Sequence, residues 1–309
     1  MEFKVGIACG RCDTFSLLGV RACPSCGHDL ALAASKQSTS SREQLMEQAR
    51  NYVCNKCSSA VPLGHKFCGS CGMAVPDEIA EFRAEYFGTM QAPGKARLVV
   101  IRSGSDTNMN GLSYALNGEQ HVAGRSQGQV LFPEDAWLNP RHASFVYEGI
   151  KLMVRDEGSV NGVFLRLRRP ASLTSGDVFL CGQQVLRVDE TPAGGGPEIE
   201  DGVYFYASPK HASSFAVTQL VEGGADAMVR CCRDDVVEIG REGTDMNFPN
   251  DVYMSGRHAR VEKTKEGQLV LSDSGSRNGT YLRISGPEQL EHGDYLFLGK
   301  QLLRIEITA

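Results

Sequence analysis

The C-terminal two thirds of this chain contains the same module twice, and that duplication limits what the chain can fold into. Gly124-Arg125 recurs 116 residues later as Gly240-Arg241. Further on, QQVLRV at 183–188 matches KQLLRI at 300–305 at an offset of 117. A period this long predicts two tandem domains rather than a solenoid, whose repeats run about 20 to 50 residues.

Both repeats have the pattern of β-structure. Short runs rich in Val, Leu and Ile lie at 98–103, 151–156 and 268–273, each bounded by turn-forming residues. Many short strands with Gly-rich turns predict β-sandwiches. The chain is therefore expected to be mainly β. The predicted order is a sandwich at 96–190, a linker at 191–212 and a second sandwich at 213–309.

Three motifs in the second repeat occur in a set order: IGR at 239–241, MSGRHARV at 254–261 and DSGSRNGTYL at 273–282. Together they resemble the forkhead-associated (FHA) domain, a β-sandwich whose loops at one end bind phosphothreonine. Phosphothreonine carries a charge of about −1.5 to −2 and three acceptor oxygens, so its site needs a cation and fixed donors.

The resemblance implies a role for each matching residue of the second repeat. Arg241 would supply the charge, Ser255 a hydroxyl donor and Asn278 a hold on the ligand's backbone. His258 would pin the loop from beneath. The phosphopeptide contacts are thus expected at Arg241, Ser255, Arg257, Arg277 and Asn278, with structural roles for Gly240 and His258. Arg257 and Arg277 could equally be solvated loop arginines.

The first repeat departs from the family pattern. Asn139 stands where the family has serine, and Val163 stands where threonine follows Asn-Gly. An asparagine amide can still donate to phosphate, so a weaker site is expected. Its contacts would be Arg125, Asn139, Arg141 and Asn161, with structural roles for Gly124 and His142. The alternative for this repeat is a scaffold or dimerisation sandwich.

Eight of the eleven cysteines form four Cys-x-x-Cys pairs in the N-terminal part. Two facing pairs build the tetrahedral sulfur shell that zinc prefers. The expected ligands of two Zn²⁺ ions are Cys9, Cys12, Cys23 and Cys26, and Cys54, Cys57, Cys68 and Cys71. A disulfide framework would need an oxidising compartment, and an iron site would use similar pairs.

This part resembles a double zinc ribbon, with halves at 1–32 and 50–75. A polar segment and a short helix are expected between the halves, with Ser40 and Glu43 forming a capping box. A further helix and linker are expected at 76–95, where Pro76 occupies a first helical position.

Composition and the absence of certain motifs exclude several classes of function. A formal charge of −5 and a pI near 5.9 give no general attraction to nucleic acid or anionic membranes. The sequence has no signal-peptide pattern and no apolar run of 18 residues, which predicts a cytoplasmic protein. No motif of a catalytic centre occurs, so an enzyme is not expected. The sequence favours a phosphothreonine-dependent adaptor in Ser/Thr kinase signalling, with the zinc ribbons as an interaction head.

Two further hypotheses concern partners. The alternative function is a zinc-ribbon nucleic-acid-binding or transcription-associated protein with FHA-like scaffolds. Against it, residues 1–90 hold nine Lys/Arg and nine Asp/Glu, so the module carries no net charge to neutralise phosphates. In addition, Thr39 and Thr191 lie in polar linkers, where a phosphorylated threonine would be tethered close to its own reader.

Overall fold

A computed structural model describes residues 6–8, 15–17, 24–26, 48–57, 59–62, 65–76, 94–106, 109–191, 206, 208–209 and 211–307. The chain divides into two compact units, Met1–Leu45 and Met46–Ala309. All regular structure in these ranges is β, which confirms the predicted mainly β fold. None of the described residues belongs to a helix that could cross a membrane.

The first unit contains one described strand pair. Strands β1 (Gly6–Ala8) and β2 (Phe15–Leu17) are antiparallel. Of the first cysteine set, only Cys26 lies in the described ranges, and most of the expected helix and linker at 76–95 falls outside them.

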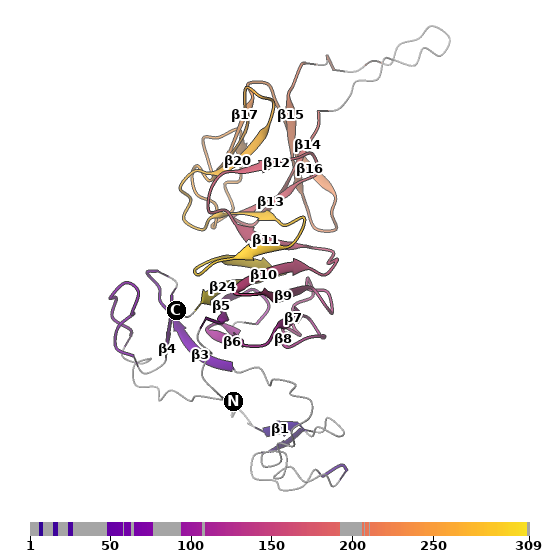
Figure 1. Ribbon diagram of the computed structural model, residues 1–309. Helices are drawn as coiled ribbons and strands as arrows, with labels where there is room; N and C mark the ends of the chain where they lie inside the picture. Colours follow the sequence, from indigo (N-terminus) through magenta and orange to yellow (C-terminus); the bar gives the residue numbers. More distant parts are fainter. Residues whose placement is uncertain are drawn as a thin grey trace. The chain divides into compact units, whose positions relative to one another are not determined.

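Most of the second unit consists of two β-sandwiches (Figure 1). The strands of the first repeat are β5 (Ala96–Ser103), β6 (Leu112–Leu116), β7 (Gln120–Gly124), β8 (Val130–Leu131), β9 (Ala143–Glu148), β10 (Lys151–Asp156), β11 (Val163–Arg166), β12 (Ala171–Leu173), β13 (Val178–Cys181) and β14 (Gln184–Asp189). Those of the second repeat are β15 (Phe215–Leu220), β16 (Asp226–Cys232), β17 (Val236–Gly240), β18 (Met246–Asn247), β19 (Ala259–Lys263), β20 (Leu269–Asp273), β21 (Thr280–Arg283), β22 (Glu288–Leu290), β23 (Tyr295–Leu298) and β24 (Gln301–Ile307).

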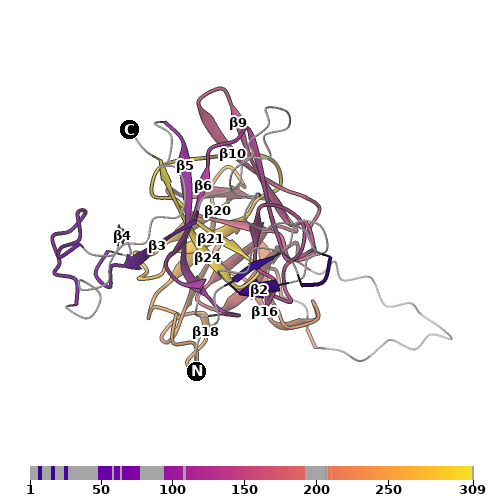
Figure 2. The same cartoon turned by 90° about the horizontal axis from the view of Figure 1, so that it is seen from below.

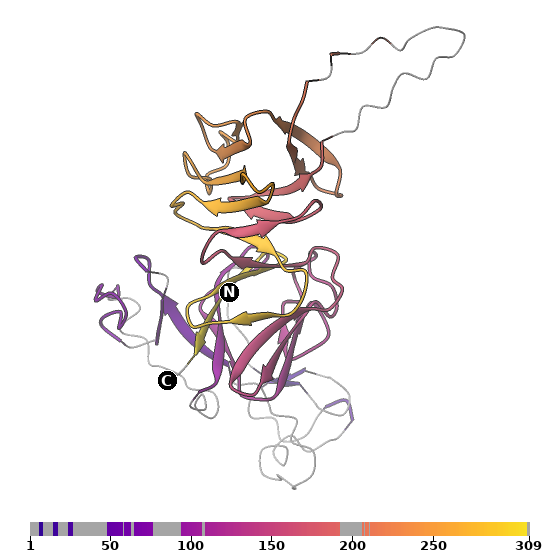
Figure 3. The same cartoon turned by 45° about the horizontal axis from the view of Figure 1, so that its top comes forward.

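The two sandwiches have the same strand order. In the first, the sheet β22-β10-β9-β7-β8 packs against the strands β11-β23-β24-β5-β6. In the second, the sheet β12-β20-β19-β17-β18 packs against β21-β13-β14-β15-β16. Strands β11 and β21 pair with each other, so the second layers of both sandwiches form parts of one long sheet, seen in Figure 3 as strands stacked one after another.

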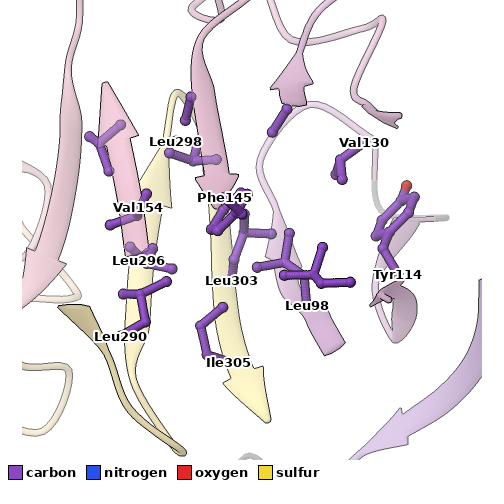
Figure 4. Close-up of a cluster of buried hydrophobic side chains, with 14 of the residues drawn as sticks. Leu98, Tyr114, Val130, Phe145, Val154, Leu290, Leu296, Leu298, Leu303 and Ile305 are labelled. Atoms are coloured by element: carbon purple, nitrogen blue, oxygen red, sulfur yellow. The ribbon is translucent and has the colours of Figure 1, made fainter. Parts of the chain in front are cut away.

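The cores do not follow the predicted boundaries 96–190 and 213–309, because the repeats exchange their last strands. Strands β22 to β24 complete the first sandwich, and strands β12 to β14 complete the second. In the first core, Leu98 and Phe145 pack with Leu296, Leu303 and Ile305, and Figure 4 shows these side chains meeting between strands of the two repeats. In the second core, Phe179 and Leu186 of the first repeat pack with Phe215 and Ile239.

The exchanged strands contribute a large part of the first sandwich's backbone pairing and buried apolar side chains. Strand β24 pairs with β5 along its whole length, from Gln301↔Ser103 to Ile307↔Ala96. Both strands are labelled in Figure 2. Its hairpin with β23 buries Leu296, Leu298, Leu303 and Ile305 completely. At about 1.5 to 3 kcal/mol for each buried aliphatic side chain, this is on the order of 6 to 12 kcal/mol of transfer free energy. The first sandwich thus depends on the end of the chain.

The segment before the second cysteine set differs from expectation at one point. The helix predicted in the polar linker does not include Gln48–Val53, which form strand β3. Strand β3 pairs with β4 (Ala60–Pro62) and, through Gln48↔Tyr114 to Arg50↔Leu112, with β6. A free sheet edge offers unpaired donors and acceptors, and this pairing outweighs local helix propensity.

Candidate functional site

Loops at one end of the second sandwich bring the predicted residues together. Arg241 follows β17, Ser255 precedes β19, and Arg277 and Asn278 precede β21. These four residues line a pocket of about 290 Å³, together with Val252, Tyr253, Met254 and Gly256. The pocket is open and rich in donors, which suits a doubly charged group that keeps part of its hydration.

A buried histidine fixes the geometry of the two main loops. The Nδ1 atom of His258 accepts a hydrogen bond from the Ser255 N–H (3.1 Å), and its Nε2 donates to the carbonyl of Gly279 (3.0 Å). His258 is completely buried and does not line the pocket. It therefore acts by holding Ser255 and Asn278 at a fixed separation.

Further hydrogen bonds orient the pocket's polar side chains. The Ser255 Oγ accepts from the Arg277 N–H (3.1 Å), which leaves its hydroxyl proton available to an anion. The Asn278 Nδ2 donates to the Tyr253 carbonyl (2.8 Å). Gly240 is required for the close approach of the two loops, because a Cβ there would overlap the Gly256 carbonyl.

The second site carries excess positive charge. Within the described residues, neither Arg241 nor Arg277 makes an ion pair. Arg257 lies beside the pocket, 71% exposed, with Glu238 at 3.7 Å. Two uncompensated guanidinium groups next to a hydroxyl and an amide form the donor set that phosphate recognition requires.

The first repeat builds the same framework. Asn139 N–H donates to the Nδ1 of His142 (3.1 Å), whose Nε2 donates to the Gly162 carbonyl (3.0 Å). Burial lowers the pKa of His142, which keeps the ring neutral and Nδ1 an acceptor. The Asn161 Nδ2 donates to the Trp137 carbonyl (2.7 Å). Gly124 approaches the Pro140 carbonyl as Gly240 approaches that of Gly256.

The charge of the first site is lower than that of the second. Val160, 77% exposed, occupies the position of Arg277. Arg141 forms an ion pair with Glu157 (2.8 Å), and its hydrogen bond lowers the pKa of that carboxyl. The Asn139 Oδ1 accepts from the Val160 N–H (3.2 Å), as the Ser255 Oγ accepts from the Arg277 N–H in the second site. Arg125 remains as the cation without an ion pair among the described residues of this site.

Sequence reasoning gave no role to the aspartates Asp135 and Asp251 or to the aromatic residues Trp137 and Tyr253. Both aspartates are buried, and each accepts the N–H of the aromatic residue two positions later. The sequence contains a signal for the two aspartates, because the Phe-Pro-x-Asp segment recurs in both repeats at the 116-residue offset.

The second cysteine set forms a candidate metal centre. The Sγ atoms of Cys54, Cys57, Cys68 and Cys71 all lie within 4.8 Å of one another. The pairs Cys54–Cys71 and Cys57–Cys68 are each 3.6 Å apart. A tetrahedral ion with metal–sulfur bonds of about 2.3 Å needs sulfur atoms about 3.8 Å apart, so these four thiols fit a closed four-sulfur site.

Comparison with known proteins supports the sequence resemblance. The family model of the FHA domain matches residues 121–182 and 237–299. The chain is 29% identical over 121 residues to the glycogen accumulation regulator GarA of Mycolicibacterium smegmatis, an alignment covering 33% of this chain and 74% of GarA.

Solved structures of low similarity were also found. One, from a study of phosphothreonine-dependent FHA domain interactions, is 24% identical and covers 32% of this chain and 99% of its own, with a TM-score of 0.19. The FHA domain of CT664 from Chlamydia trachomatis is 19% identical, covering 26% and 87%, with a TM-score of 0.16. The two matches of the family model, one to each repeat, show that the chain carries tandem FHA domains.

Proposed function

We propose that this protein is a non-enzymatic adaptor of Ser/Thr kinase signalling that binds threonine-phosphorylated proteins through its second FHA domain. The observation that carries the proposal is the pocket of that domain. Arg241, Ser255, Arg277 and Asn278 line it together, and its two arginines make no ion pair within the described residues. Arg257 lies beside the pocket, where Glu238 partly offsets its charge.

The test is removal of the central cation. Replacing Arg241 with Ala leaves a dianionic ligand facing neutral donors and Arg277, so affinity for a phosphothreonine peptide should fall by roughly 2 to 5 kcal/mol. Isothermal titration of the full chain measures this. The same peptide with unmodified threonine is the control for phosphate dependence. Equal affinities of the wild-type and Arg241→Ala chains would remove the second domain as a reader.

The first FHA domain is the weaker reader in this proposal. Arg125, Asn139, Arg141 and Asn161 hold the same framework, but the Arg141–Glu157 pair and Val160 reduce the positive charge. Arg125→Ala should therefore reduce total phosphopeptide binding less than Arg241→Ala does, as measured by the same titration.

Zinc would stabilise the N-terminal part. The spacing of Cys54, Cys57, Cys68 and Cys71 supports one ion, and the matching sequence of Cys9, Cys12, Cys23 and Cys26 supports a second. Elemental analysis of protein purified without chelators should find about two zinc ions per chain. Metal-free protein with oxidised cysteines would contradict the assignment.

Self-capture would regulate the adaptor. Thr191 lies two residues after the end of β14, at the end of a described segment, and Thr39 lies outside the described residues. A phosphorylated threonine tethered to its reader binds at an effective concentration in the millimolar range. Phosphorylation followed by small-angle scattering should show a more compact chain or a dimer. An unchanged radius of gyration in a monomer would exclude self-capture.

A further inference from the structure

We propose that each phosphothreonine site is positioned by the terminal hairpin of the opposite repeat, so that the two FHA domains complete each other within one chain. The phosphothreonine part of this inference rests on the proposed function, whereas the exchange itself does not. The hairpins are β13–β14, which we call the first hairpin, and β23–β24, the second hairpin. The recognition loops are residues 133–140 and 249–256.

The second recognition loop is anchored to the first hairpin by one buried carboxylate. The Oδ2 of Asp251 accepts hydrogen bonds from the Gln183 N–H (2.7 Å) and the Gln184 Nε2 (2.8 Å). Its Oδ1 accepts from the Tyr253 N–H (2.9 Å). The Tyr253 carbonyl in turn accepts from Asn278. A continuous hydrogen-bonded path therefore runs from the first hairpin to a side chain that lines the pocket.

The first recognition loop is held in the same way by the second hairpin. The Oδ2 of Asp135 accepts from the Lys300 N–H (2.8 Å) and the Gln301 Nε2 (2.7 Å), and its Oδ1 accepts from the Trp137 N–H (3.0 Å). The Lys300 ammonium also lies 3.2 Å from the centre of the Trp137 ring. Asp135 is fully buried, so its hydrogen bonds to the second hairpin are part of the packed interior.

The turns that meet these aspartates are interchangeable. Gly182 (φ 60°) and Gly299 (φ 54°) adopt the same left-handed conformation. A Cβ added to either glycine would lie 2.7 or 2.9 Å from the Oδ2 of the facing aspartate. Because each repeat contributes an equivalent loop and an equivalent turn, either hairpin can serve either loop, and local sequence does not decide the partner.

The pairing of strands decides which hairpin serves which recognition loop. The family model matches 121–182 and 237–299 as continuous segments, so the usual domain would keep its own hairpin. In this chain β24 pairs with β5, β14 pairs with β15, and β11 and β21 pair at the crossing point. Arg97 of the first repeat also forms an ion pair with Glu306 of the second. The second sandwich is thus formed by strands β12 to β21, which follow one another in the sequence.

Disulfide trapping in the full chain tests the exchange without any phosphopeptide. Ala96 pairs with Ile307, and Glu190 occupies the corresponding position after the first hairpin. The variant with Ala96→Cys and Ile307→Cys should form a cross-link within one chain under mild oxidation, identified by peptide mass spectrometry. The matched variant with Ala96→Cys and Glu190→Cys should not. A cross-link in the matched variant, or a first variant that cross-links only between two copies of the chain, would overturn the proposal.

A binding experiment then tests positioning of the second site. It uses the full chain with Arg125→Ala, to confine a labelled phosphothreonine peptide to the second domain. Gln184→Glu places a carboxylate against that of Asp251 and should weaken binding at least tenfold more than the matched change Gln301→Glu. The opposite order would show that each repeat keeps its own hairpin.

A second substitution that restores binding would show that Gln184→Glu acts by displacing the recognition loop and not by destabilising the whole fold. Asp251→Asn removes the charge repulsion and should restore part of the affinity lost in Gln184→Glu, although it weakens binding in the otherwise unaltered chain. No rescue would overturn the role of Gln184. If the predicted cross-link forms but no variant binds the peptide, the exchange stands and the proposed function fails.

Discussion

At the scale of single residues, the two sites share their hydrogen bonds and differ in charge. Both histidines bridge the same two loops, and both asparagines donate to a carbonyl of the recognition loop. The charge differs at Val160 and Arg277, which occupy equivalent positions, and Arg141 forms a closer ion pair with Glu157 than Arg257 forms with Glu238. Phosphate affinity should therefore follow the number of unpaired cations, because the framework is the same.

This comparison predicts a gain of function. Val160→Arg should strengthen phosphothreonine binding by the first domain by about 1 kcal/mol or more, since it restores a charge that can bond to phosphate. Titration in an Arg241→Ala background isolates the first site. Val160→Gln, of similar length but without charge, is the matched control. Equal affinity of the two variants would contradict a purely electrostatic difference.

A second residue-scale prediction concerns pH. Burial, with a contribution from Lys95, lowers the pKa of His121 to about 4, against about 6.5 for a free histidine. The folded state therefore binds fewer protons than the unfolded state, so this stability is present above pH 6.5 and is lost as the pH falls toward 4. Between pH 7 and 5 the loss should reach about 2 kcal/mol in urea unfolding. His121→Gln should show a smaller loss, and an equal loss would exclude His121.

At the scale of elements, the strands were predictable because their signal is local. The runs at 98–103, 151–156 and 268–273 correspond to β5, β10 and β20 within two residues. The exchange of hairpins could not be predicted, because QQVLRV and KQLLRI present the same apolar face to either core. Strand β3 was missed for a related reason, since its pairing partner β6 is remote in sequence.

Strand β3 connects the candidate metal centre to the first sandwich. It pairs with β4 beside the cysteines and with β6 of the first FHA domain, and Arg304 donates to Ser59 next to Cys57. Metal removal should therefore free β3 and expose the edge of β6. Hydrogen exchange should rise in Leu112–Leu116 after chelation, and also in the Cys68→Ser variant. Unchanged protection of β6 would show that the edge is held without the metal.

At the scale of the whole molecule, the exchange makes the two sandwiches one cooperative unit. Each core contains strands from both repeats, and the long sheet crosses from one core to the other at β11 and β21. Independent tandem domains would unfold separately, because few contacts would join them. Here, loss of either core removes strands that the other needs.

The last prediction follows from this coupling. Leu303 is completely buried in the first core although it belongs to the second repeat, and Leu303→Ala should cost about 2 to 5 kcal/mol. In calorimetry, residues 94–307 should unfold in one transition whose calorimetric and van't Hoff enthalpies agree, and the variant should shift that whole transition. The matched change Leu186→Ala in the second core should shift the same transition. Two transitions, each moved by only one variant, would show that the sandwiches unfold independently.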